Sequence, residues 1–131
     1  MKNIVFDDPI GISKFFDEVM GYKTEWAKPR CIGIKQNDEY IGAIIYDYFN
    51  GASINMHWAA KRGALWLTRE FRWVMFHYPF VQLGVKRLSG VFPASNNQSI
   101  ALGERLGFEL EATLKLSAPD GDIVIYKMMK N

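Results

Sequence analysis

The sequence has little or none of several features that are typical of particular classes of protein. It contains one cysteine, Cys31, so no disulfide can form within the chain. An isolated cysteine in an apolar alternation is expected to be a small core residue, as suits a reducing compartment. No apolar run approaches the length of a membrane span, and Asp7-Asp8 interrupts the stretch that a signal peptide would need. We therefore expect a cytoplasmic protein with no membrane partner.

The net charge of the chain is also small. The 16 lysines and arginines exceed the 14 aspartates and glutamates by only two, and the only basic pairs are Lys61-Arg62 and Lys86-Arg87. A nucleic-acid-binding face needs a basic patch or stripe, so we expect no nucleic-acid partner. Repeats, low-complexity segments and linkers are absent from the sequence as well. With 131 residues, 49% of them hydrophobic, the chain is expected to form a single domain over residues 1–131.

The first half of the sequence predicts one helix followed by a meander of three antiparallel strands. The segment 7–22 has apolar residues at helical spacing and is opened by Asp8-Pro9. The residues expected on its buried face are Ile12, Phe15, Phe16 and Val19. Strands are predicted over 30–36, 40–49 and 52–60. Asn50-Gly51 joins the last two, because both residues tolerate the positive φ of a tight hairpin.

The second half predicts a long helix, a strand, a short helix and two strands. The segment 65–84 is expected to be the longest helix, bent or ended by Pro79. A strand over 86–93 precedes a helix over 97–107, which Gly107 closes. The segment 108–117 alternates, with Phe108, Leu110, Ala112, Leu114 and Leu116 expected on one face, and 122–129 is a mostly apolar last strand. This order of elements indicates an α/β protein with a mixed sheet.

One stretch carries a more specific pattern. Asn96-x-x-Ser99 begins the short helix, Leu106-Gly107-Phe108 ends it, and the next strand contains Glu111 before a Gly121-Asp122 turn. In this order the residues resemble the signature of the Gcn5-related N-acetyltransferase (GNAT) family. The similarity is to the branch that modifies ribosomal-protein N-termini and to its small bacterial and phage relatives. It covers about the last two-thirds of the chain.

The resemblance implies a mixed, mostly antiparallel central sheet flanked by helices, with acetyl-CoA as co-substrate. Two neighbouring strands, 52–60 and 86–93, are expected to splay apart and hold the cofactor, with its pantetheine arm lying along the first of them. The diphosphate is expected at the N-terminus of the helix over 65–84, where N–H groups and the dipole favour anions. The residues expected to contact the cofactor are Met56, His57, Trp58, Lys61, Arg62, Gly63, Ala64, Asn96 and Ser99. The family's Arg/Gln-x-x-Gly-x-Gly/Ala loop is reduced here to the single glycine Gly63.

The catalytic candidates are Ser99, His57 and Glu111. Many family members use a tyrosine as the thiol-side acid, but Gly103 stands at that position, so Ser99 is the candidate donor. His57 is the first candidate base, because histidine changes charge near neutral pH, and Glu111 is the alternative. Asn96 is expected to bond the pantetheine amide. Local helix capping by Asn96 and Ser99 is the competing interpretation.

The function that follows is acetyl transfer from acetyl-CoA to a primary amine. A protein N-terminus, a lysine and a small amine all remain open as acceptors, and no metal is expected. The alternative is a catalytically degenerate GNAT-fold binding or accessory protein, phage-encoded for instance, that acts through a partner. The single-glycine loop and Gly103 favour that alternative, whereas Asn96, Ser99 and the basic loop favour the enzyme. The apolar last strand, 122–129, could pair with a second chain, so a homodimer is possible on this pattern.

Overall fold

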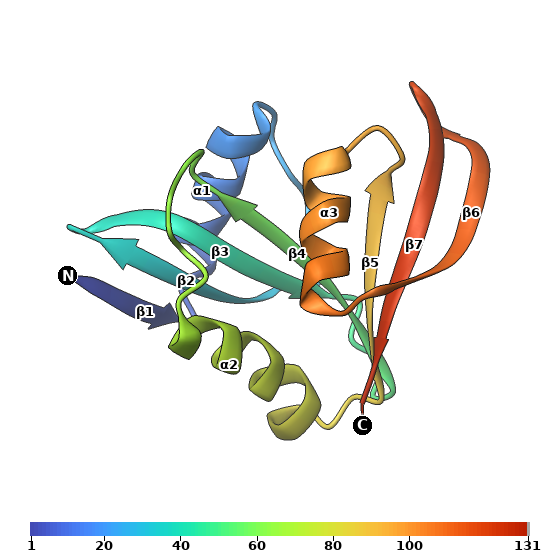
Figure 1. Cartoon of the computed structure of the whole chain (residues 1–131). Helices are drawn as coiled ribbons and strands as arrows, with labels where there is room; N and C mark the ends of the chain where they lie inside the picture. The colour runs from blue at the N-terminus through green and yellow to red at the C-terminus, as the bar shows by residue number, and fades with distance from the viewer. Residues whose placement is uncertain (131) are drawn as a thin grey trace.

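Seven strands form one sheet in the computed structural model of the chain, which describes residues 1–130 (Figure 1). In chain order the elements are β1 (Lys2–Phe6), α1 (Pro9–Met20), β2 (Arg30–Gln36), β3 (Glu39–Asp47), β4 (Ser53–Ala60), α2 (Arg69–His77), a π-helical turn η1 (Tyr78–Gln82), β5 (Arg87–Pro93), α3 (Asn97–Leu106), β6 (Glu109–Ala118) and β7 (Gly121–Met129). The strand order is β1-β2-β3-β4-β5-β7-β6, and every described pair except β4–β5 is antiparallel. The predicted α/β class with a mixed, mostly antiparallel sheet is confirmed.

The N-terminal strand β1 was not predicted from the sequence. Residues 2–6 pair antiparallel with β2 along its whole length and form one edge of the sheet. The strand has five residues, and its side chains are half-buried or exposed, so it lacks the apolar alternation that would have revealed it.

The helix expected over 65–84 is shorter than predicted. α2 begins at Arg69, because Thr68 adopts an extended conformation and accepts a hydrogen bond from the Phe71 N–H. It has nine residues, against twelve in α1, so α1 is the longest helix. Residues 65–67 stay outside the helix, and Trp66 packs against Gly42 so closely that a Cβ there would lie 2.6 Å from the indole. At the other end, Pro79 lies in the π-helical turn that finishes the helical segment.

The sheet separates two hydrophobic clusters. The larger is packed under α2 and α3 and includes Trp58, Phe71 and Phe108. The smaller lies under α1 and contains Phe16 and Cys31, where burial raises the pKa of the thiol to about 11. Cys31 is therefore a core residue, as predicted. Val19, expected on the buried face of α1, is 41% exposed.

The β4–β5 junction is the feature that creates a site. These strands pair only at Ser53–Arg87, Ile54–Leu88 and Asn55–Ser89, and from Met56 onward they separate. Figure 1 shows β4 and β5 diverging, with α3 beside the opening. The predicted splay of these two strands is confirmed, and the second half of β4 has a backbone edge that β5 does not pair.

The last two strands differ from expectation in position and in register. β7, expected to be available for pairing with a second chain, lies between β5 and β6, so β6 forms the edge. A bulge between Leu110 and Ala112 shifts the register of β6, so the expected single apolar face is broken. Leu116 is 85% exposed, whereas Phe108 is buried.

Candidate functional site

A cleft of about 960 Å³ opens where the second half of β4 leaves β5. Its walls come from the second half of α1, the last residues of β4, the loop 61–67 and α3 with its cap Asn96. The cofactor candidates that line it are Trp58, Lys61, Arg62, Gly63, Ala64, Asn96 and Ser99. The structure thus brings together seven residues from three separate segments that the sequence pattern singled out. Their roles stay predictions.

The cleft is basic. Arg62 and Arg105 line it together with Lys61, and Glu18 is the one acidic residue among the described lining residues. Lys61 also contacts Glu39 at 3.0 Å, but both side chains are at least half exposed, so this pair is weak. The cations are therefore available to an anionic ligand. The first turn of α2 does not line the cleft in the described chain, so positive charge comes from the loop rather than from that helix end.

Asn96 is both a helix cap and a cleft residue. Its Oδ1 accepts a hydrogen bond from the Ser99 N–H at 3.3 Å, so the local capping role expected of it is present. That bond uses only the oxygen of the amide, which leaves the two Nδ2 hydrogens as donors. Capping and ligand binding are therefore compatible at this residue.

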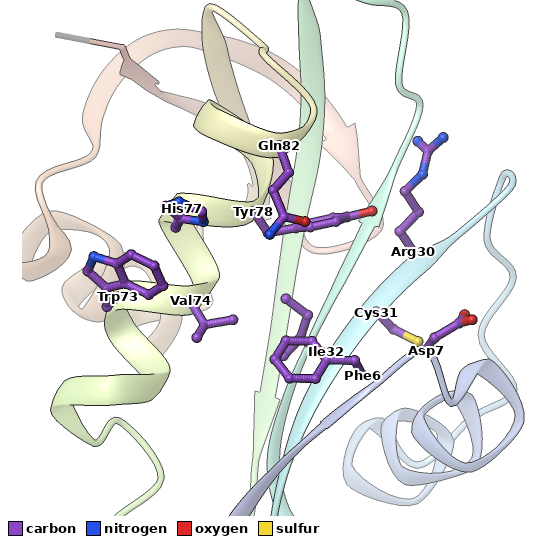
Figure 2. Close-up of a pocket in the computed structure, with 10 residues that line it drawn as sticks. All are labelled: Phe6, Asp7, Arg30, Cys31, Ile32, Trp73, Val74, His77, Tyr78 and Gln82. Carbon is purple, nitrogen blue, oxygen red and sulfur yellow. The ribbon is translucent and has the colours of Figure 1, made fainter.

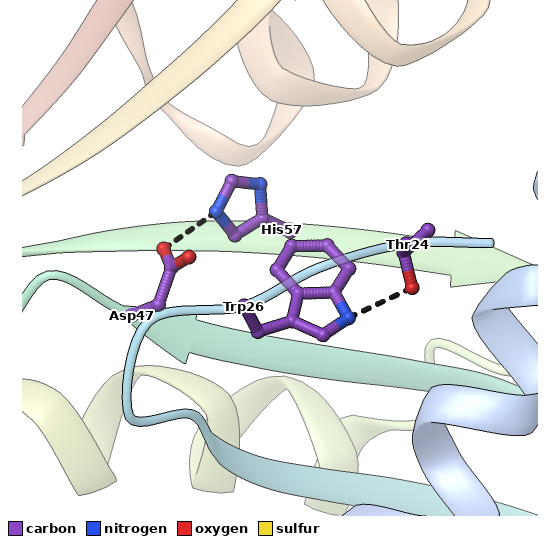
Figure 3. Close-up of polar contacts among 4 residues, drawn as sticks. All are labelled: Thr24, Trp26, Asp47 and His57. Carbon is purple, nitrogen blue, oxygen red and sulfur yellow. Dashed lines mark hydrogen bonds and ion pairs between the residues drawn. The ribbon is translucent and has the colours of Figure 1, made fainter.

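A histidine–aspartate pair lies on the opposite face of β4 from Trp58. His57 Nε2 lies 2.8 Å from Oδ1 of Asp47, and their side chains are 25% and 4% exposed (Figure 3). The Trp26 ring packs against the imidazole at a centroid distance of 4.8 Å. Its indole N–H is held in turn by Thr24 Oγ1 at 2.9 Å. The imidazole is thus fixed on two sides.

The sequence signal for this pair was weak. The partner of His57 depends on the register of β3 against β4. That register places Asp47 opposite Asn55, two residues before His57 on the same face. The Asn50-Gly51 turn sets such a register, yet an apolar alternation gave no reason to couple these two side chains.

Three predicted residues do not line the cleft: His57, which lies on the other face of β4, Met56 and Glu111. Met56 points into the larger core and is 1% exposed. Glu111 is bound by both terminal nitrogens of Arg87, and this hydrogen bonding lowers the pKa of its carboxyl. Arg87 belongs to the paired end of β5, and a carboxylate held by a guanidinium is a poor base. The structure does not place Glu111 with the other candidates.

A second pocket of about 670 Å³ lies between the α2–η1 segment and the adjoining ends of β1 and β2 (Figure 2). Trp73 stacks on His77 at its rim, with ring centroids 4.2 Å apart. None of the predicted site residues lines this pocket. Over residues 1–130, no group of three or more potential metal-binding side chains comes together, and no helix is long and apolar enough to cross a membrane.

No protein-family model matches the sequence, and no curated protein matches it either. Solved structures do match. A spermidine N-acetyltransferase variant from Vibrio cholerae aligns with a TM-score of 0.76 at 12% identity, over 98% of this chain and 93% of that one. A ribosomal-protein alanine N-acetyltransferase from Escherichia coli gives 0.70 at 16% identity, over 98% and 94%.

The acetyltransferase PseH from Campylobacter jejuni, solved with acetyl coenzyme A, gives a TM-score of 0.62 at 15% identity, over 90% of this chain and 77% of that one. This chain spans 61% of another match, a probable acetyltransferase, at 20% identity and a TM-score of 0.66. The chain therefore has the fold of GNAT acetyltransferases.

Proposed function

We propose that the protein transfers an acetyl group from acetyl-CoA to a primary amine. The observation that carries this proposal is the convergence of three features in one cleft: the unpaired edge of β4, the basic loop and the capped start of α3. The donor set fits the cofactor, since an extended polar arm can bond a free strand edge and a diphosphate suits clustered cations. The acetyltransferase structures with the same fold support the proposal.

Acetyl-CoA supplies the acetyl group as a thioester when it is bound. Backbone groups of Met56, His57 and Trp58 bind and orient its arm along the open edge of β4. Arg62 and Arg105 hold the phosphates, and Gly63, with a φ of +77° and open space around its Cα, lets the loop backbone approach them. On the side of α3, Asn96 donates from Nδ2. The Ser99 hydroxyl is the proton donor for the departing thiol and regains a proton from solvent, to which the His57 imidazolium returns the proton of the amine.

The proton of the acceptor amine goes to His57. With Nε2–H donated to the Asp47 carboxylate, Nδ1 carries the lone pair that accepts this proton. Asp47 fixes the tautomer and stabilises the imidazolium that forms, as a buried carboxylate does in other histidine-based sites. Trp26 keeps the ring from rotating away.

The acceptor is a primary amine of a protein N-terminus, a lysine or a small molecule. The related folds include an enzyme named for spermidine and one named for an alanine of a ribosomal protein, so both classes belong in the test. Thiol release from acetyl-CoA, followed with spermidine, an alanine-initiated peptide and a lysine peptide, identifies the acceptor. Thermal unfolding measured in parallel reports cofactor binding, with about 2.7 kcal/mol of stabilisation expected at 100 times the dissociation constant.

The two histidines provide a matched pair of variants. We expect His57→Gln to lower kcat/KM by about 10²- to 10⁴-fold, because a general base is removed. His77→Gln, which changes a histidine stacked on Trp73 in the second pocket, should leave the rate unchanged. Equal activity of wild type and His57→Gln would remove His57 from the mechanism while leaving acetyl transfer intact.

One observation favours the second candidate, a GNAT-fold binding protein without catalysis. The loop 61–67 has a single glycine, and α2 starts six residues beyond Gly63, so its first turn does not line the cleft. Cofactor-induced stabilisation without thiol release for any amine would support this candidate. No stabilisation at millimolar acetyl-CoA would leave only a role without the cofactor.

A further inference from the structure

Trp58 combines burial, position and an unmet hydrogen-bonding requirement. Its side chain lines the cleft, and the residue is only 7% exposed. Over residues 1–130, its indole Nε1 is the only buried side-chain nitrogen or oxygen that lacks a hydrogen-bond partner. Such a group carries a desolvation penalty, and each instance calls for an explanation.

No acceptor lies within hydrogen-bonding distance of the indole N–H, and apolar groups pack around the ring. Phe92 and Phe108 pack around it at centroid distances of 5.5 and 5.7 Å. Gly103 of α3 faces the edge of the ring, and a Cβ there would lie 3.4 Å from it. An aromatic pair and a glycine leave an apolar niche in which one polar N–H is enclosed.

The position of Trp58 indicates what the acceptor is. The residue lies three positions beyond Asn55, the last residue of β4 that pairs with β5, and therefore stands where the strands have begun to separate. From this residue the cleft continues to the basic loop on one side and to α3 on the other. A pantetheine arm that follows the strand edge carries amide and thioester carbonyls past this point.

We propose that the Trp58 Nε1–H donates a hydrogen bond to a carbonyl oxygen of the bound acyl-coenzyme A. This inference rests on the proposed function and adds a side-chain donor to the backbone edge of β4. Because the N–H is covered, the atoms over it must move aside when the arm enters. Trp58 is then a positioning residue that fixes the arm at the splay.

Trp58→Phe tests the proposal, because it retains an aromatic ring and removes the N–H. Trp66→Phe is the matched control: Trp66 lines the same cleft and is equally 7% exposed, but its N–H is not among the buried unpaired groups. Calorimetric titration with coenzyme A and with acetyl-coenzyme A should show a dissociation constant raised roughly two- to tenfold in Trp58→Phe. Trp66→Phe should remain near the wild-type value.

An NMR measurement on the wild type covers the case in which Trp58→Phe fails to fold. The four tryptophans give four indole N–H signals, which Phe variants of Trp26, Trp66 and Trp73 assign by elimination. Coenzyme A should move the Trp58 signal downfield, while the signal of Trp26, already bonded to Thr24, serves as the reference.

The outcomes distinguish a failure of the Trp58 inference from a failure of the proposed function. Wild type that binds coenzyme A with an unmoved Trp58 signal and an unchanged Trp58→Phe affinity overturns this inference alone. Equal weakening by Trp58→Phe and Trp66→Phe also overturns it, because that result indicates lost packing. Wild type that does not bind coenzyme A overturns the proposed function and this inference with it.

Discussion

Asn96 illustrates how one side chain serves two purposes. Its Oδ1 caps α3, so Asn96→Ala should cost about 1 kcal/mol of unfolding free energy. Asn96→Ser should restore most of that stability, because serine caps well, but its shorter side chain loses the Nδ2 donors. We expect the serine variant to bind coenzyme A roughly two- to tenfold more weakly in a calorimetric titration. Normal stability with normal affinity would reduce Asn96 to a cap.

Cys31 should be almost unreactive in the native protein. Its side chain is buried, and burial raises the pKa of the thiol to about 11, so little reactive thiolate exists at pH 8. Labelling with a chromogenic disulfide reagent should be slow in buffer and complete within the mixing time in concentrated denaturant. Rapid labelling of the folded protein would show that the adjoining pocket opens around Cys31.

At the residue scale, the sequence predicted those site residues that are marked by short, local spacing. Asn96 and Ser99 were found because a helix stop and a strand restart follow them at defined distances. The His57–Asp47 pair was not found, because it forms across two strands and depends on their register. The unpaired indole of Trp58 depends on what three distant aromatic and glycine residues fail to offer, which no sequence pattern records.

Among the helices, α3 contains a glycine whose replacement should increase the stability of the protein. Gly103 has helical conformation, and a Cβ there would meet Trp58 at 3.4 Å, an ordinary contact. Gly103→Ala should therefore raise the unfolding free energy by up to about 1 kcal/mol in urea titration, through helix propensity. Gly107→Ala is the control and should be destabilising, since Gly107 closes the helix at a φ of +107°. A loss of stability in Gly103→Ala would mean that the Trp58 indole cannot shift to make room for the added methyl group.

Element boundaries were predicted where a turn or a cap is strong and missed where it is weak. β2 and α3 match expectation closely because polar turns and Gly107 delimit them. The start of α2 was missed because the apolar residues 65–67 continue the helical spacing, although Thr68 caps the helix after them. Here packing of Trp66 on Gly42 outweighs local periodicity.

The whole molecule should lose stability in mild acid. Hydrogen bonding lowers the pKa of four carboxyls: Asp8 by Tyr40, Asp17 by Thr24, Glu111 by Arg87 and Asp122 by the Leu116 N–H. A carboxyl whose pKa is lower in the folded chain than in the unfolded chain binds fewer protons when folded. Its contribution is present above the ordinary value near 4 and is lost as the pH falls through the folded value.

Urea midpoints should therefore stay nearly constant from pH 6 to about pH 5 and fall between there and pH 3. Asp8→Asn offers a control, because asparagine still caps α1 but has no carboxyl to protonate. This variant should show a smaller drop across the same range. A midpoint that is constant down to pH 3 would contradict the assignment of these four groups.

At this scale the order of the elements after β1 followed from the periodicity and turn residues of the sequence, and the splayed pair followed from the resemblance to a known family. β1 could not be predicted, because its five half-buried or exposed residues show no strand pattern and form a strand only by pairing with β2. The position of β7 inside the sheet was also missed. An apolar strand signals burial, but not which neighbour provides it.

Within the sheet, only three residue pairs between β4 and β5 join the strands of the first half of the chain to those of the second half. This junction is a seam between two consecutive halves of the chain. Strands β1 to β4 arise from residues before the loop 61–67 and strands β5 to β7 from residues after it, and the exposed Gly63 lies in that loop. Exposed loop tips tolerate breaks, so a chain cut at Gly63 should yield two complementary fragments. A ligand lying along the seam would touch both of them. Reassembly would then depend on coenzyme A, which would make the pair of fragments a sensor for it.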